Sequence, residues 1–364
     1  MSLSDDRSMV RDRLGGAVRR ALDGVSSPGA VSKAYARWIR RRERSLHDAT
    51  KDRASLPFEW GVEHLGLGGV AELDALVRRA QERSDTLFSA GPRFEGPYTF
   101  DGALLRFPSA VTSRYPVNDT VVGRVFRGRS RHAVIVIPEW TASWQSHVTF
   151  CRLLVRCGFT ALLVSAPYHH ARQPSCVARP EYLCSANIGR TLAAVRQGVL
   201  DVRRAADWLE MQGVERIAVT GTSAGSLIGF LAFVHDTRLQ KGTFVMLAAS
   251  FADVVWRGMA TEHVRAALSG HVTLEQLRHL WSPLSPLSHV DRLVDDSRSM
   301  LFVSGTYDPT CLPDLTRPLY EALRQRGLRH REMWLPCGHH TMATFPFNVI
   351  ATAQVLAFLS GLGG

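Results

Sequence analysis

The chain has 364 residues, of which 45% are hydrophobic and 21% are charged, and its formal net charge is +11 at pH 7. These values are ordinary for a globular protein with a large core, and the length favours one main domain with an extension or insertion. No stretch reaches 18 uncharged apolar residues, so the sequence predicts no membrane-spanning helix.

Arginine supplies nearly all of the positive charge, and the one dense basic cluster lies between residues 33 and 44. We interpret this cluster as the solvated face of a helix. The alternative is a patch that binds an anionic membrane or nucleic acid. We expect no nucleic-acid partner.

The six cysteines include no CxxC pair, which argues against a zinc or redox motif. Charged residues interrupt the first thirty positions, so no secretory signal peptide is expected there. The sequence therefore predicts a cytoplasmic protein with reduced, mostly buried thiols, without a metal or another cofactor.

Residues 1–92 are predicted to be a helical extension. Residues 1–30 are polar and glycine-broken, 31–53 are typical of a helix with a basic face, and 70–87 carry apolar residues at helical spacing. Large apolar residues are sparse in this region, so we expect it to pack on the main domain, residues 93–364.

From residue 97 onward, predicted strands alternate with predicted helices. Strands are expected at 97–107, 119–126, 132–137, 161–166, 216–220, 243–249, 300–304 and 331–335, and helices at 190–212, 224–234 and 348–359. The pattern predicts an α/β fold with a mostly parallel central sheet flanked by helices, whose ligands bind beyond the carboxyl ends of the strands. Residues 251–298 break the alternation and are predicted to be a helical, lid-like insertion.

The strongest chemical signal is GTSAG at residues 221–225. It matches the G-x-S-x-G nucleophile elbow, and it stands between a predicted strand and an apolar helix, as that motif requires. Such a turn exposes the hydroxyl of Ser223 and demands small neighbours. It also places the backbone N–H of Ala224 at a helix N-terminus, where it can donate to an oxyanion.

A serine nucleophile needs a base and an acid that orients the base. Asp308, in GTYDP, follows the strand predicted at 300–304, and His339, in CGHH, follows the last strand. Both stand where the sheet presents its loops. His340 is an alternative base, and Asp253 is a reserve acid.

The segment from about residue 95 to the end resembles the α/β-hydrolase superfamily in GTSAG, GTYD and CGHH and in its strand–helix frame. It is similar to the esterase, dienelactone-hydrolase and peptidase-like branches rather than to lipases with an HGGG loop. The resemblance implies Ser223 as nucleophile, Asp308 as acid and His339 as base.

One position departs from the family pattern. Many members have His-Gly after the first buried strand, where this chain has Pro138-Glu139-Trp140. We expect the Trp140 N–H to complete the oxyanion hole with Ala224. The carboxylate of Glu139 would oppose an oxyanion unless it points away, pairs with an arginine or has a raised pKa.

The loop at 167–172 is also expected to border the substrate pocket, through His169, His170 and Arg172. Arg172 would bind a substrate anion or neutralise Glu139; alternatively, the loop is held by its own hydrogen bonds. His340 is a further pocket candidate. A metal held by these histidines and nearby carboxylates is a minor hypothesis, because no HExxH motif supports it.

The leading functional hypothesis is hydrolysis of a small-molecule carboxylic ester through an acyl-enzyme on Ser223. An acyltransferase or a peptidase of the same fold would use the same intermediate. A hypothesis from another class is a non-catalytic hydrolase-like protein that binds anionic membrane or nucleic acid through residues 33–44. We expect the insertion and the N-terminal region to form the acyl and leaving-group pockets.

Overall fold

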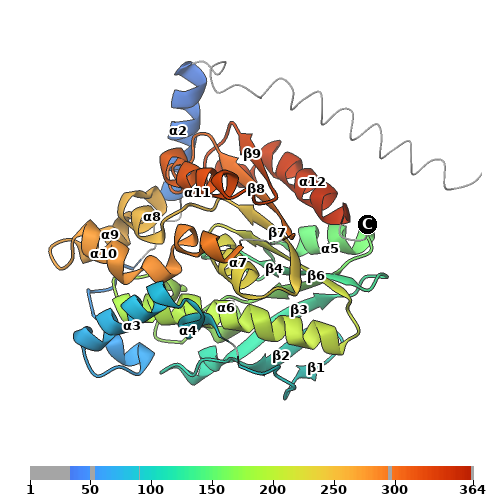
Figure 1. Ribbon diagram of the computed structural model, residues 1–364. Helices are drawn as coiled ribbons and strands as arrows, with labels where there is room; N and C mark the ends of the chain where they lie inside the picture. The colour runs from blue at the N-terminus through green and yellow to red at the C-terminus, as the bar shows by residue number, and fades with distance from the viewer. Residues whose placement is uncertain (1–32, 50–53, 90, 294–296, 362–364) are drawn as a thin grey trace, which may run out of the picture.

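One nine-stranded sheet organises the computed structural model, which describes residues 33–49, 54–89, 91–293 and 297–361 (Figure 1). Its strands are β1 (Thr99–Phe100), β2 (Leu104–Pro108), β3 (Thr120–Phe126), β4 (His132–Ile137), β5 (Thr160–Val164), β6 (Arg216–Thr222), β7 (Leu239–Val245), β8 (Ser299–Gly305) and β9 (His330–Leu335). Their order is β1-β2-β3-β5-β4-β6-β7-β8-β9. The pairs from β5 to β9 are parallel, and those from β1 through β3 to β5 are antiparallel. The predicted α/β fold is confirmed.

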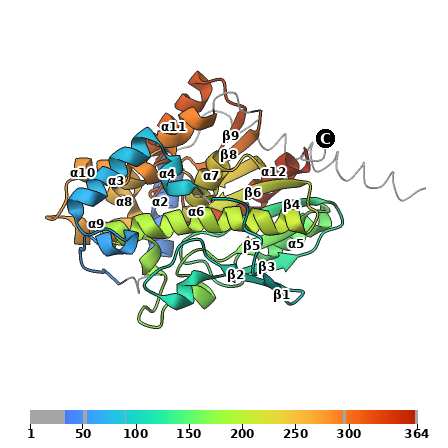
Figure 2. The same ribbon diagram turned by 60° about the horizontal axis from the view of Figure 1, so that its bottom comes forward.

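Apolar side chains on both faces of the central strands explain the helical layers on both sides. In β4, Val134 and Val136 belong to the core beneath α5 (Val148–Arg156) and α12 (Phe347–Ser360). Ile135 and Ile137 belong to the core beneath α6 (Ile188–Met211) and α7 (Ala224–His235). Figure 2 looks onto the face that α6 crosses. A strand covered on both faces is apolar throughout, as HAVIVI is.

The helices before the sheet pack against those inserted between β7 and β8. The first group contains α2 (Lys33–Asp48), α3 (Val70–Glu82) and α4 (Asp85–Phe88), and the second contains α8 (Phe251–Arg257), α9 (Glu262–Leu268) and α10 (Leu274–Leu280). Asp74 of α3 lies 2.6 Å from His279 of α10, and Gln81 donates to Ser282 at 2.7 Å. The early helix α3 thus packs on the later helix α10, and both lie at the left of Figure 1.

Several predicted boundaries were wrong for local reasons. The strand expected at 97–107 is a hairpin, because Asp101 accepts hydrogen bonds from the N–H groups of Ala103 and Leu104 and Gly102 has φ 96°. The strand expected at 243–249 spans Leu239–Val245 and ends before Met246, whose φ is 59°. The helix α11 (Pro313–Gln325) was not predicted. The prediction for residues 1–30 lies outside the described residues.

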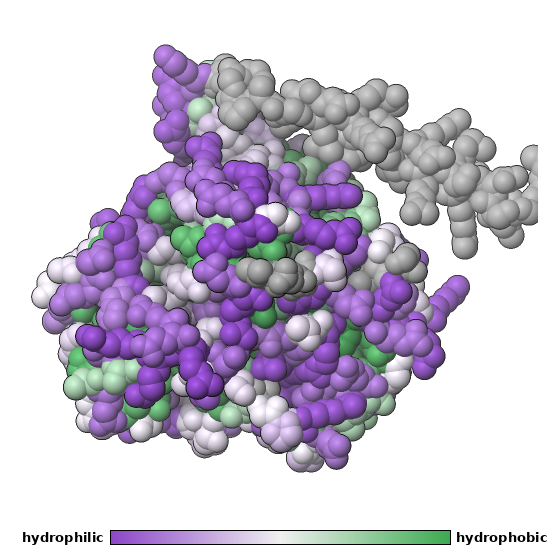
Figure 3. All heavy atoms as spheres, in the orientation of Figure 1, coloured by the Kyte–Doolittle hydropathy of each residue, from purple (hydrophilic) through white to green (hydrophobic). Residues whose placement is uncertain are grey.

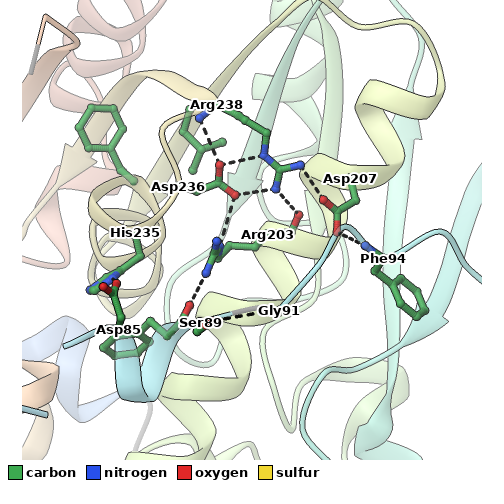
Figure 4. A network of polar contacts seen from close by, with 12 residues as sticks. Asp85, Ser89, Gly91, Phe94, Arg203, Asp207, His235, Asp236 and Arg238 are labelled. Atoms are coloured by element: carbon green, nitrogen blue, oxygen red, sulfur yellow. Dashed lines mark hydrogen bonds and ion pairs between the residues drawn. The ribbon is translucent and has the colours of Figure 1, made fainter. Parts of the chain in front are cut away.

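A network of ion pairs holds the C-terminal end of α7, the end away from Ser223 (Figure 4). Arg238 binds Asp236 and Asp207 at 2.6 Å each, and Asp236 also pairs with Arg203 of α6 at 3.4 Å. The network ties the α7–β7 turn to α6. Because it lies at the opposite end of α7, we assign it a structural role.

Two further predictions, on the cysteines and on membrane-spanning helices, can be compared with the structure. All six cysteines are free, four of them buried, in agreement with the prediction of mostly buried thiols. Within the described ranges, the helices are too short or too polar to cross a membrane.

Candidate active site

Ser223 occupies a sharp turn between β6 and α7. Its backbone has φ 52° and ψ −117°, a strained conformation for a residue with a side chain. A Cβ on Gly221 would lie 2.2 Å from the carbonyl oxygen of Gly225, and one on Gly225 would lie 2.2 Å from that of Ile137. The glycines at both ends of GTSAG are therefore required by close backbone approach, as the elbow motif predicts.

His339 and Asp308 complete a hydrogen-bonded series with Ser223. The Ser223 Oγ lies 2.9 Å from His339 Nε2, and His339 Nδ1 lies 2.8 Å from Asp308 Oδ2. The other carboxylate oxygen of Asp308 accepts from the N–H groups of Thr310 and Cys311, at 2.7 and 2.8 Å. Asp308 is thus fixed as an acceptor, which makes Nδ1 of His339 the donor and leaves Nε2 free to accept from the serine hydroxyl.

The environment of His339 favours its protonated form. Burial lowers its pKa, but the charge of Asp308 and the hydrogen bond to it outweigh burial, so the pKa is raised well above the ordinary value. Only 10% of the His339 side chain and 1% of the Asp308 side chain are exposed. The pair therefore interacts with little screening by water, so an imidazolium at this position is strongly stabilised.

Two backbone N–H groups border the serine. Those of Ala224, at the start of α7, and Trp140, after β4, have no hydrogen-bond partner among the described residues. Glu139 stands between β4 and this second donor, and its carboxylate lies 2.6 Å from Nε2 of His147. Burial raises the pKa of Glu139, but His147 outweighs burial and the net shift is downward. The carboxylate thus pairs with a histidine rather than an arginine, and the option of a raised pKa is wrong.

The loop at 167–172 supports the Trp140 loop from behind. His169 is 1% exposed; its Nδ1–H donates to the Pro167 carbonyl, so its Nε2 accepts from the Thr141 N–H at 3.2 Å. Burial lowers the pKa of His169 to about 4. His170 Nε2 lies 2.8 Å from the carbonyl oxygen of Ala142. Neither histidine lines the cavity at Ser223, so their expected place in the substrate pocket is corrected to one of support.

Arg172 is a core residue and cannot reach a substrate. It is 0% exposed and donates to Asp201 at 2.8 Å and to the carbonyl oxygens of Ser165 and Asn118, each at 2.9 Å. The expectation that it binds a substrate anion or neutralises Glu139 is wrong. No local pattern marks Asp201 as its partner, because Asp201 lies in a long helix 29 positions further along the chain.

The N-terminal helix α2 holds the loop that carries His339. Glu43, 1% exposed, accepts from the N–H of His340 at 2.8 Å, and from the N–H and hydroxyl of Thr341 at 2.7 and 2.6 Å. A Cβ on Gly338 would lie 2.4 Å from the carboxyl carbon of Glu43. The hydroxyl of Tyr35 donates to the Pro336 carbonyl at 2.7 Å. Glu43 was not predicted as a functional residue, because it stands inside the arginine cluster.

The other candidates from the sequence lie apart from this series or at its edge. Asp253 pairs with Arg278 at 2.7 Å, so its placement does not support the reserve-acid hypothesis. His340 lines the cavity, but it is His339 that reaches Ser223. Among the described residues, one group has metal-ligand proximity: Asp308, Cys311 and His339. Asp308 and His339 are engaged with each other, and the Cys311 thiol donates to the Met246 carbonyl.

Comparison with known proteins agrees with this architecture. Residues 194–363 match the model of the prolyl oligopeptidase family. The acetyl xylan esterase from Paenibacillus sp. R4 is similar with a TM-score of 0.55 at 15% identity, over 80% of this chain and 99% of the esterase. Acetyl xylan esterase 1 from Thermoanaerobacterium sp. JW/SL YS485 has a TM-score of 0.51 at 14% identity, over 80% and 98%. The chain therefore has the α/β-hydrolase fold.

A third structural similarity is partial. The acylaminoacyl peptidase of Pyrococcus horikoshii has a TM-score of 0.50 at 13% identity, over 76% of this α/β-hydrolase but only 43% of the peptidase. No curated protein sequence matches the chain. At these identities the similarities establish the fold, so the reaction has to be argued from the site.

Two cavities of this α/β-hydrolase meet at Ser223. The larger, about 800 Å³, lies between α5 and α12 and includes His339. The smaller, about 80 Å³, lies beside α7 and α8 and includes Ala224. The insertion lines the smaller cavity through Phe251 and Val254, as expected. No described residue of the N-terminal region lines either one, so its expected role as a pocket wall is corrected to support of the His339 loop.

Proposed function

We propose that this α/β-hydrolase cleaves carboxylic esters through an acyl-enzyme on Ser223, with His339 as general base and Asp308 as the orienting acid. The observation that carries the proposal is the continuous series from Ser223 Oγ to His339 to Asp308, at 2.9 and 2.8 Å. Ser223 also lines both cavities, so a substrate carbonyl in either has access to its hydroxyl.

In the first half of the reaction, the Ser223 oxygen attacks the ester carbonyl carbon while Nε2 of His339 takes the serine proton. The carbonyl oxygen becomes an oxyanion, which accepts from the free N–H groups of Ala224 and Trp140. The intermediate collapses, the bond to the alcohol oxygen breaks, and His339 gives its proton to that oxygen. The acyl group remains on Ser223.

In the second half, water replaces the alcohol. His339 takes a proton from the water, the hydroxide attacks the acyl carbon, and the intermediate expels the Ser223 oxygen, which regains its proton from His339. The carboxylate of Asp308 stabilises the imidazolium that forms in both halves. Its two backbone N–H donors keep it in place throughout.

A neutral, largely apolar ester suits the lining of the larger cavity. Glu139 is the one acidic residue among the described lining residues, and no lysine or arginine is among them. The net charge of +11 therefore does not reflect a binding site for an anionic substrate. Arg172 is fully buried and cannot form such a site. A small-molecule ester remains the proposed partner.

A peptidase of the same fold is the second candidate. The match of residues 194–363 to the prolyl oligopeptidase family favours it. Both reactions share the acyl-enzyme, but an amide leaving group requires stronger protonation by His339. Parallel assays on phenyl acetate and on an acetyl-alanine anilide distinguish the two, since a peptidase must cleave the anilide, whereas the ester proposal expects cleavage of phenyl acetate without cleavage of the anilide. An added alcohol that diverts the acyl product would indicate an acyltransferase.

Substitution of the nucleophile tests the proposal. Ser223→Ala is expected to reduce phenyl acetate hydrolysis by about 10⁴-fold or more, because the covalent route is lost. Ser269→Ala, which removes an exposed serine hydroxyl bonded only within its own helical turn, is the matched control and keeps the activity. Full esterase activity in Ser223→Ala would refute the mechanism.

A further inference from the structure

The two cavities at Ser223 differ tenfold in volume, and different catalytic groups line them. His339 lines the larger cavity and not the smaller, whereas Ala224 lines the smaller and not the larger. Trp140 and Ser223 line both. In a tetrahedral intermediate on Ser223, this arrangement of catalytic groups determines which part of the substrate enters which cavity.

The carbon bound to Ser223 Oγ carries three other groups: the oxyanion, the leaving alcohol oxygen and the acyl chain. The alcohol oxygen must lie within hydrogen-bond reach of His339 Nε2, because that nitrogen supplies its proton. The alcohol portion therefore extends into the larger cavity. The oxyanion lies between the N–H groups of Trp140 and Ala224, which turns the acyl chain toward the smaller cavity.

We propose that the protein hydrolyses short-chain acyl esters of large, apolar alcohols, with the alcohol in the α5–α12 cavity and the acyl group in the small cavity beside α8. The proposal rests on the proposed esterase function and adds the division of the substrate between the two cavities.

The walls of the larger cavity suit a long apolar alcohol. Helix α5 contributes Phe150 and Leu153, and α12 contributes Val349, Val355 and Leu356. Val349 is 55% exposed, so the cavity reaches the surface along α12. Helix α12 has no charged residue, and the lining residues among those described include no lysine or arginine that would bind a phosphate or carboxylate. Burial of an alkyl chain here contributes binding free energy in proportion to its apolar area.

The smaller cavity limits the acyl chain. Its walls include Leu227, Leu247, Phe251 and Val254, so it is an apolar pocket rather than only a place for an oxyanion. At about 80 Å³ it has room for a handful of heavy atoms, since one water needs roughly 10–15 Å³ on this measure. An acetyl or propionyl group fits this space, and an octanoyl group exceeds it.

Two isomeric esters test the division without a difference in overall hydrophobicity. Octyl acetate and ethyl octanoate have the same atoms, but the long chain is on the alcohol in the first and on the acyl group in the second. We expect kcat/KM for octyl acetate to exceed that for ethyl octanoate by at least ~10-fold, the scale on which pockets discriminate chain length. Equal values, or a preference for ethyl octanoate, would overturn the proposal.

Variants in the two cavities should move this ratio in a defined way. Leu153→Trp narrows the larger cavity and is expected to lower kcat/KM for octyl acetate by at least ~10-fold. Val254→Ala widens the smaller cavity and should raise kcat/KM for ethyl octanoate. Val117→Trp, at a surface valine outside both cavities, is the matched control and should leave the ratio unchanged. If Leu153→Trp instead lowers kcat/KM for ethyl octanoate and Val254→Ala raises kcat/KM for octyl acetate, the acyl chain lies in the larger cavity and the division is overturned.

Failure of the division is distinguishable from failure of the function on which it rests. If phenyl acetate is hydrolysed and Ser223→Ala abolishes its hydrolysis, the esterase function stands and the isomer ratio alone decides the division. If Ser223→Ala leaves phenyl acetate hydrolysis unchanged, both the function and the division are overturned.

Discussion

Replacing Glu43 by alanine should impair turnover although this residue lies outside both cavities. Its buried carboxylate accepts three hydrogen bonds from His340 and Thr341, the residues that directly follow His339. Removal leaves two buried backbone N–H groups without their acceptor. We therefore expect the loop to shift and the distance from His339 Nε2 to Ser223 Oγ to change.

The magnitude follows from the hydrogen bonds that are lost. A hydrogen bond to a charged group contributes about 1.5–3 kcal/mol, so removal of all three takes roughly 4.5–9 kcal/mol from the interactions that hold the loop, before water replaces some of them. A displacement of about 1 Å at a catalytic group costs roughly 10²-fold in rate. Glu43→Ala is thus expected to lower kcat by about 100-fold with a smaller effect on KM. Glu43→Gln, which keeps one acceptor oxygen, should recover part of the loss.

Steady-state kinetics on phenyl acetate, combined with thermal unfolding, give the readout. The control is Glu262→Gln, which weakens a different contact of α2, the exposed pair of Arg44 and Glu262 at 3.1 Å. Such surface pairs contribute about 0–1 kcal/mol, so this variant should keep kcat. If Glu43→Ala keeps the wild-type kcat and unfolds at the wild-type temperature, the Glu43 carboxylate does not position the His339 loop. An equal loss in both variants would mean that attachment of α2, not the carboxylate, is what matters.

Three further predictions concern titrating groups. Asp308→Asn should lower kcat by about 10³–10⁴-fold and move the acidic limb of the kcat/KM profile to lower pH, because the charge that raises the His339 pKa is gone. Glu139→Gln should move the same limb in the same direction, since the carboxylate and His339 interact through space; an unchanged limb in kcat/KM measurements would contradict this. Burial lowers the pKa of His235 to about 2 and of His289 to about 4. Both stay neutral when folded but bind protons when unfolded below about pH 6.5, so each should remove about 2 kcal/mol of stability at pH 5 relative to pH 8. Urea unfolding of wild type and His289→Gln checks this, and an equal pH dependence in the two would argue against it.

Local sequence patterns predicted those features that depend on neighbours along the chain. The elbow needed only GTSAG between an apolar strand and an apolar helix, because strand, turn and helix are consecutive. The positions of Asp308 and His339 followed from the rule that loops after parallel strands share one edge of the sheet. The structure brings both residues to Ser223.

The features that sequence missed depend on partners far along the chain. Arg172 was predicted to be a cation in a loop beside the pocket. It lies in the core instead, because it forms an ion pair with Asp201, twenty-nine positions away. Glu43 stands 296 positions from His339 in an arginine-rich segment, and no periodicity marks it as buried. In contrast, the hairpin at β1 and β2 was missed although its turn residues, Asp101 and Gly102, are a local signal within the predicted strand.

An activity-based label tests the central claim, that Ser223 is a nucleophile activated by His339, without knowledge of the substrate. The folded protein is treated with a fluorophosphonate and its peptides are examined by mass spectrometry. We expect modification at Ser223 in the wild type and a loss of modification in His339→Ala. A folded wild-type protein that is not modified, or one modified equally fast in His339→Ala, would contradict it.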